Sequence, residues 1–230
     1  MSEQKYNCDR VCPCKDMTMP MELIVLTGGP GAGKTAALEF IRKVLCEHIA
    51  ILPEAASILF GGGFWRLDST SARKASQRAI YHVQVETQNL VLQENKWAMG
   101  LCDRGTLDGL AYWPGTESEF YHSLNTNRDA EYAKYKAVIH LKSPNVKQGY
   151  NHQNPIRTES ARVAAHIDQQ IHEVWKNHPN YTVVNSTSEF VDKVHSVVEQ
   201  VRALMPECCR KHLMDTADSE IKSGTHVSQS

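Results

Sequence analysis

The sequence predicts an α/β domain in which a parallel sheet of five strands is covered by helices on both faces. Short runs of continuous apolar residues alternate with longer helical patterns along the chain, and no internal repeat interrupts this alternation. Because the apolar residues in each run are continuous, the strands should be buried on both faces. The 230 residues suffice for one such domain with a sizeable core.

Each predicted strand is an apolar run, and a helical pattern follows it. The predicted strands are ELIVLT at 22–27, AILPE at 50–54, AMGLCD at 98–103, KAVIHLK at 136–142 and YTVVN at 181–185. The predicted helices are 33–48, 70–97, 158–177 and 187–204, with short helices within 105–135. The segment SPNVKQGYNHQNP at 143–155 is expected to be a loop, because it is rich in Pro, Gly and Asn.

Within the region 70–97, the helix at 76–97 carries apolar side chains that are expected to pack in the core rather than to form a cofactor surface. They are Ile80, Val83, Val85, Leu90, Val91 and Trp97.

The two ends of the chain differ from the alternating region. Residues 1–20 are polar and predicted to be flexible, residues 206–230 are predicted to be a disordered tail, and 21–205 are predicted to form the domain. No apolar run reaches the roughly 20 residues of a membrane helix, and residues 1–20 lack the apolar centre of a signal peptide. Seven unevenly spaced cysteines do not resemble a disulfide framework, so a cytoplasmic protein is expected.

The stretch LIVLTGGPGAGKTAAL at 23–38 carries the most specific signal, because Gly28, Gly33, Lys34 and Thr35 fit the pattern G-x-x-x-x-G-K-[ST]. Small residues allow successive backbone N–H groups to turn around phosphate oxygens, and the following helix adds its positive end. Lys34 is expected to reach the β- and γ-phosphates, and the Thr35 hydroxyl to bind Mg²⁺. The predicted phosphate-binding residues are Gly28, Gly29, Pro30, Gly31, Ala32, Gly33, Lys34, Thr35 and Ala36.

Charged residues lie at the ends of two predicted strands. Asp103 ends the third strand and is expected to hold Mg²⁺ or to orient an attacking group; the alternative is a helix N-cap. Glu54 ends the second strand and is expected to face an acceptor, where it can act as a base; the alternative is again a helix cap. Arg104 either reaches a substrate phosphate or pairs with Glu54. These ends should meet, because ligands of parallel sheets bind at the carboxyl ends of the strands.

Arg157 and Arg162 follow the predicted loop and are candidates for binding phosphate. A guanidinium suits phosphate oxygens through its planar fork, and a mobile lid at 143–157 would close it over the transferring group. The alternative is a solvated helix face on which Glu159 and Arg162 pair. No Asn-Lys-x-Asp motif reads guanine, so the nucleotide is either ATP or GTP.

With these residues assembled, the chain resembles the NadR-like AAA family, a group of small P-loop proteins. The group includes kinase-like ATPases and the GTP-binding translocation-defect proteins. The resemblance rests on LTGGPGAGKT, PEAA, DRGTLDGLAYW and the late pattern YNHQNPIRTESARVAAHID…W…HPN. In the late pattern the matching residues are Asn154, Arg157, Glu159, Ala161, Asp168 and Trp175. The resemblance implies a P-loop NTPase three-layer sandwich like that of nucleotide kinases, with a lid that carries Arg157.

Two functions fit these residues. The first is Mg²⁺-dependent transfer of the γ-phosphoryl group of a nucleoside triphosphate to a small nucleoside- or nucleotide-like acceptor. Lys34, Arg104 and Arg157 would then offset charge, and Glu54 or Asp103 would orient the acceptor hydroxyl. The second is a regulatory protein with slow NTP hydrolysis whose output is a partner or lipid contact. A net charge of −1 argues against a nucleic-acid partner, and the sequence indicates no oligomeric state.

Overall fold

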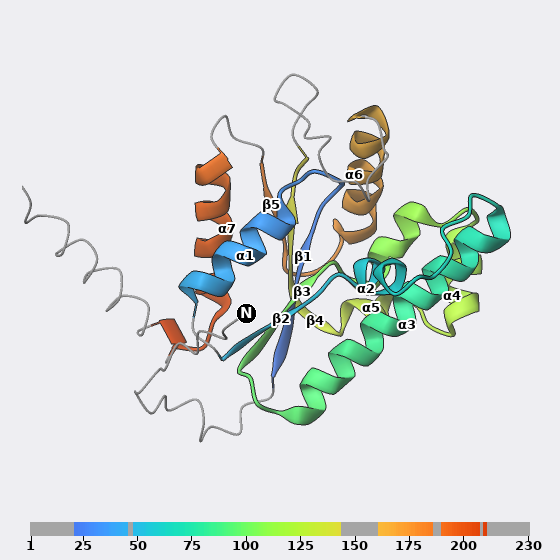
Figure 1. Ribbon diagram of the computed structural model, residues 1–230. Helices are drawn as coiled ribbons and strands as arrows, with labels where there is room; N and C mark the ends of the chain where they lie inside the picture. Colours follow the sequence, from blue (N-terminus) through green and yellow to red (C-terminus); the bar gives the residue numbers. More distant parts are fainter. Residues whose placement is uncertain (1–20, 46–47, 144–160, 186–189, 208, 211–230) are drawn as a thin grey trace, which may run out of the picture.

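The structure is a computed structural model that describes residues 21–45, 48–143, 161–185, 190–207 and 209–210. Its centre is a parallel sheet of five strands in the order β2-β3-β1-β4-β5. The strands are β1 (Glu22–Thr27), β2 (Ile49–Leu52), β3 (Met99–Asp103), β4 (Tyr135–Leu141) and β5 (Tyr181–Val184). The predicted parallel sheet is therefore confirmed. Figure 1 shows helices on both of its faces.

The central strand β1 divides the core into two layers. Ile24 and Leu26 face the helices α1 (Lys34–Val44) and α7 (Phe190–Leu204). Leu23 and Val25 face the opposite cluster, which includes side chains of α3 (Thr70–Glu94) and α6 (Ala161–Trp175). All four side chains are at most 3% exposed. Burial on both faces explains why the sequence of this strand is continuously apolar.

Shorter elements cover the sheet beside α3 and α6. They are α2 (Ala55–Gly61), the 3₁₀ helix η2 (Thr106–Tyr112), α4 (Glu117–Leu124) and α5 (Arg128–Tyr132). They pack with α3 at one side of the sheet (Figure 1).

Several element ends differ from the predicted ones for local reasons. Strand β2 ends at Leu52 because Pro53 follows it and has no N–H to continue a ladder. Helix α3 ends at Glu94 because Asn95 adopts a left-handed conformation with φ 47°. Beyond α7, Cys209 is fully buried in the core, so the packed domain extends past the predicted boundary at 205. No helix among the described residues is long and apolar enough to cross a membrane.

The prediction that the apolar side chains of helix α3 pack in the core is wrong for Leu90. Leu90 is 59% exposed, whereas the buried residues of α3 include Ser76, Gln84 and Gln88. The helix thus turns polar side chains towards the interior, which apolar spacing alone does not reveal.

A buried carboxylate joins the elements on this side of the sheet. Glu131 is fully buried, and it accepts hydrogen bonds from Tyr81 Oη at 2.7 Å, Thr106 Oγ1 at 2.6 Å and Thr126 Oγ1 at 2.6 Å. It also pairs with Lys134 Nζ at 2.7 Å. Burial raises the pKa of Glu131, but the bonds from Lys134 and the hydroxyls outweigh burial and lower it.

We predict that Glu131→Gln lowers the free energy of unfolding by about 2–4 kcal/mol at neutral pH, because it removes a charge that four donors share. The folded pKa is below the ordinary value of 4.5, so this stabilisation is present above 4.5 and is lost as the pH falls through the folded pKa. Urea unfolding at several pH values should show the difference from wild type shrinking below pH 4.5. A pH-independent difference no larger than that of the exposed control Glu117→Gln would contradict this.

Candidate functional site

The loop after β1 has a backbone that only glycine accommodates at several positions. Gly28, Gly31 and Gly33 have φ values of 138°, 74° and 91°. A Cβ atom at Gly28 would lie 2.1 Å from the carbonyl oxygen of Leu141. The glycines of the phosphate-loop pattern therefore meet geometric requirements of the backbone.

Lys34 is the first residue of α1 and lies inside this loop. Its side chain is buried, and Nζ donates hydrogen bonds to the carbonyl oxygens of Gly28 at 2.8 Å and Gly29 at 3.0 Å. The ammonium group is thus held at the N-terminus of a helix, where backbone N–H groups favour an anion. Thr35 and Ala36 follow on the exposed side of the first turn.

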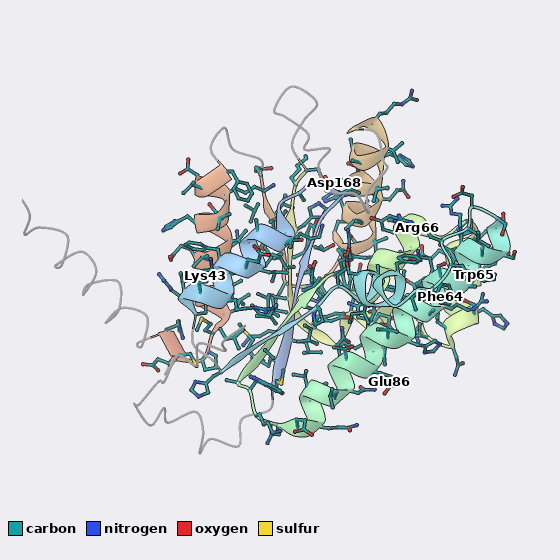
Figure 2. The ribbon with its side chains drawn as sticks, in the orientation of Figure 1. Lys43, Phe64, Trp65, Arg66, Glu86 and Asp168 are labelled. Atoms are coloured by element: carbon teal, nitrogen blue, oxygen red, sulfur yellow. The ribbon has the colours of Figure 1, made fainter. Side chains whose placement is uncertain are left out.

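Two buried side chains hold the loop from outside. Asp168 Oδ1 accepts a hydrogen bond from the N–H of Gly29 at 2.7 Å and contacts His140 Nε2 at 3.1 Å and Ser143 Oγ at 3.2 Å. Figure 2 shows Asp168 between α6 and the loop that follows β1. Burial raises the pKa of Asp168, but His140 and the N–H of Gly29 outweigh burial and lower it, which keeps the carboxylate charged.

Lys193 holds the other side of the loop. Its Nζ donates to the carbonyl oxygens of Ala32 at 2.8 Å and Lys142 at 2.5 Å. Burial lowers the pKa of Lys193 to about 8. The loop is therefore fixed by side chains from α6 and α7 as well as by its own glycines.

Glu54 and Arg104 form an ion pair at the carboxyl ends of β2 and β3. Arg104 Nε lies 2.6 Å from Glu54 Oε1, and Ser57 Oγ donates to Glu54 Oε2 at 2.5 Å. Burial raises the pKa of Glu54, but the Arg104 charge and the Ser57 hydroxyl outweigh burial and lower it to about 2. Glu54 occupies the N-cap position of α2, yet its carboxylate caps no backbone N–H.

Arg104 also contacts the loop and a second carboxylate. Its Nη1 lies 3.3 Å from the carbonyl oxygen of Gly28 and 3.3 Å from Asp108 Oδ2. Asp108 is in turn bonded by Thr27 Oγ1 at 2.5 Å and Trp175 Nε1 at 2.7 Å. Arg104 adopts φ 78°, a left-handed conformation that is uncommon for a residue with a side chain. The surrounding bonds hold this conformation in place.

Asp103 ends β3, where its neighbour in β1 is Leu26. It does not cap η2, whose N-cap is Gly105. Burial raises the pKa of Asp103, and the Glu54 charge adds to this effect, while Lys34 opposes it. Among the described residues, no group bonds the buried oxygen Oδ1 of Asp103.

The residues present fit a Mg²⁺ ion. The unsatisfied oxygen of Asp103 and the exposed hydroxyl of Thr35 are hard oxygen donors of the kind that Mg²⁺ prefers. The described residues contain no group of three or more His, Cys, Asp or Glu side chains that would hold a metal by themselves. In Mg²⁺ sites of phosphoryl-transfer proteins, phosphate and water complete a shell of one or two protein ligands.

A cavity of about 320 Å³ opens beside the loop, and Glu54 and Arg104 form part of its wall. It lies between α2, α3, η2 and α6. Its lining also includes Pro30, Ala55, Ala56, Ser57, Phe60, Arg66, Leu67, Asp68, Arg73, Ser76, Gln77, Ile80, Tyr81, Gln84, Gly105, Thr106, Asp108, Gly109, Tyr112, Val163 and Ile167. A cavity of this volume suits a small organic ligand.

The structure brings most of the predicted site residues together. The carboxyl ends of the strands bring together Lys34, Glu54, Asp103 and Arg104. Arg104 pairs with Glu54, which was one of the two alternatives predicted for it. Arg157 and the predicted lid lie outside the described residues, apart from Ser143 at its start. Arg162 is exposed in the first turn of α6. Its role in binding phosphate stays a prediction.

Sequence reasoning did not assign functional contacts to Asp108, Asp168, Trp175, Gln84 or Lys193. Asp168 and Trp175 belong to the late pattern by which the chain resembles a family, but no role was predicted for them. A signal for Asp108 exists in DRGTLD, where it follows Arg104 by four residues. Nothing local in the sequence points to Lys193 or Gln84.

Comparison with known proteins adds one finding. A family model described as an AAA domain matches residues 23–190. The matched range contains the phosphate loop, both charged strand ends and every residue that lines the cavity. No curated protein matches the chain.

We predict that Asp168→Ala weakens triphosphate binding and lowers the free energy of unfolding by about 1–3 kcal/mol, because the N–H of Gly29 loses its buried acceptor. Asp168→Asn retains a carbonyl oxygen for this N–H and should have a smaller effect. Thermal unfolding and titration with a fluorescent nonhydrolysable triphosphate measure both quantities. The matched control is Gln169→Ala, an exposed neighbour on the same helix. If Asp168→Ala behaved like this control, the hydrogen bond between Asp168 and the N–H of Gly29 would contribute to neither stability nor triphosphate binding.

Proposed function

Because the chain belongs to the AAA domain family, whose members are nucleotide-binding P-loop proteins, we propose that it is a Mg²⁺-dependent phosphotransferase. Its donor would be ATP or GTP, and its acceptor a small nucleoside- or nucleotide-like molecule in the cavity. Membership of the chain in the NadR-like subgroup stays a prediction.

One observation carries this proposal: the cavity and the phosphate loop share a wall. Arg104 lines the cavity and also contacts the carbonyl oxygen of Gly28 in the loop. Pro30 of the loop lines the cavity as well. Hydrolysis alone requires only a water molecule beside the γ-phosphate, whereas transfer requires a place for the acceptor. A cavity that shares a wall with the loop would supply that place.

The residues at this junction suit transfer of a phosphoryl group. Lys34 would leave its bonds to the loop carbonyls and offset charge on the β- and γ-phosphates. Arg104 would offset charge on the transferring group from the cavity side. Glu54, whose pKa is about 2, is a weak base, so it would orient the acceptor hydroxyl by accepting its hydrogen bond. A loose transition state needs little base strength, which is compatible with this role.

Asp103 and Thr35 would hold Mg²⁺. The ion, when bound, would supply charge neutralisation between the β- and γ-phosphates. Arg157, on the segment predicted to be a lid, and Arg162 are proposed to add cations and to exclude water.

A regulatory NTPase is the second candidate, and a surface feature favours it. The segment between α2 and α3 exposes Phe64, Trp65 and Leu67, with Trp65 78% exposed. Figure 2 shows Phe64 and Trp65 at the outer side of the molecule. An exposed aromatic group of this kind suits contact with a partner.

The two candidates differ in their dependence on an acceptor. Nucleoside diphosphate release is measured with Mg²⁺ and ATP or GTP, with and without candidate acceptors. Release that rises at least about tenfold with an acceptor supports transfer. Release that is slow and equal in both conditions contradicts the phosphotransferase proposal and favours the regulatory alternative.

Lys34→Ala should reduce turnover at least about 100-fold, because a cation that stabilises a developing charge in a dry site contributes several kcal/mol. The exposed lysine Lys43 at the far end of α1 (Figure 2) provides the matched control Lys43→Ala. Wild-type turnover in purified, folded Lys34→Ala would refute the assignment of the phosphate loop.

Asp103→Asn should raise the Mg²⁺ concentration needed for half-maximal turnover by about tenfold, because an amide is a weaker ligand than a carboxylate. Thermal unfolding should change little, since Oδ1 makes no bond to the described residues. A Mg²⁺ titration that superimposes on that of wild type would exclude Asp103 from the metal site.

A further inference from the structure

Helix α3 turns a row of polar side chains towards the cavity. Ser76, Gln77 and Gln84 line it, and Ser76 and Gln84 are only 5% and 8% exposed. Glutamine and serine at these depths are unusual, because buried polar groups are costly unless they are bonded.

The hydrogen-bonding capacity of this row is largely unused. Gln84 Nε2 donates to the backbone carbonyl oxygen of Arg104 at 2.5 Å. Within the described part of the chain, neither Gln84 Oε1 nor the Ser76 hydroxyl has a partner, and the same holds for the Gln77 amide. None of these atoms is among the buried polar atoms that lack a partner, so solvent in the cavity reaches them. A ligand in the cavity would satisfy them.

The surroundings of the row define the part of the ligand that would lie there. Phe60, Ile80, Tyr112, Val163 and Ile167 supply apolar walls. The row itself is uncharged. Apolar walls and amide groups together suit a flat ring whose edge carries hydrogen-bond donors and acceptors.

The end of the cavity near the phosphate loop has a different character. The carboxylates of Glu54 and Asp108 line it, and both of their charges act on Asp103. Arg104 pairs with both Glu54 and Asp108. The Arg104 charge is thus already shared by two carboxylates. A phosphate on the acceptor would be repelled by these carboxylates, whereas a neutral hydroxyl would find an acceptor in Glu54.

We propose that the acceptor is an uncharged molecule that joins a hydroxyl to a flat, hydrogen-bonding ring, as a nucleoside does, and that Ser76, Gln77 and Gln84 select it. This inference rests on the proposed function and decides between its two acceptor classes. The hydroxyl oxygen forms a bond to the γ-phosphorus, and the bond from this phosphorus to the β,γ-bridging oxygen breaks. The nucleoside diphosphate leaves with that electron pair, and the hydroxyl proton passes to solvent.

The competing acceptor is a monophosphate held at the cavity mouth. Arg66 and Arg73 line the cavity from exposed positions, beside Asp68. Arg73 Nη2 donates to the carbonyl oxygen of Tyr112 at 3.1 Å, and Arg66 lies over the Phe60 ring. A test must therefore compare neutral and phosphorylated forms of the same molecule.

The experiment measures binding and turnover with the four common ribonucleosides, their 5′-monophosphates and free ribose. Calorimetry with a nonhydrolysable triphosphate present reports binding, and diphosphate release reports transfer. The variants are Ser76→Ala, which breaks no bond to the described residues, and Gln84→Met. The control is Gln93→Met, an exposed glutamine on the same helix.

At least one nucleoside should bind more tightly than its monophosphate and than ribose. Ser76→Ala should weaken its binding by about three- to tenfold with triphosphate affinity unchanged, as expected for one lost hydrogen bond. Gln84→Met should weaken it by about tenfold or more, because this variant also loses the bond to the carbonyl oxygen of Arg104. Gln93→Met should match wild type.

Tighter binding of monophosphates or of ribose overturns the inference, as does the absence of nucleoside binding. It is also overturned if Ser76→Ala and Gln84→Met bind nucleoside like Gln93→Met. Failure of the proposed function is a separate result, in which nucleosides bind through the row but no acceptor increases diphosphate release.

Discussion

The guanidinium group of Arg104 is the interaction on which the rest of the site depends. It joins Glu54 at the end of β2, Asp108 in η2 and the carbonyl oxygen of Gly28 in the phosphate loop. A buried cation is costly unless carboxylates surround it, and here two do. Gln84 fixes the backbone carbonyl of the same residue. One side chain therefore sets the distance between the loop that would hold the donor and the cavity that would hold the acceptor.

Helix α6 strengthens this junction from the opposite side. Asp168 bonds the loop at Gly29, and Trp175 bonds Asp108 two turns further along the same helix. Ile167 of the same helix contributes to the cavity wall. Any displacement of α6 would thus disturb both halves of the site at once. This shared support is a physical reason to regard the loop and the cavity as one site rather than as two neighbouring features.

The sequence was informative where function depends on local backbone pattern. The glycines around Lys34 and the apolar strands predicted the phosphate loop and the sheet, and the rule for parallel strands placed Glu54 and Asp103 beside them. The sequence did not predict that polar side chains of α3 face the cavity. A helix with apolar residues at many positions is assigned to the core until the elements that pack against it are known. Asp108 was missed because its role arises from contacts with Arg104 and Trp175, which only the tertiary structure brings together.

The most direct test of the central claim follows the fate of the γ-phosphoryl group. In a single turnover with γ-labelled triphosphate, Mg²⁺ and a nucleoside that binds the cavity, the label is separated into organic phosphate ester and inorganic phosphate. Our account predicts that most label enters the ester and that Arg104→Gln abolishes this transfer. Label that appears only as inorganic phosphate, at the same rate with and without nucleoside, would contradict it.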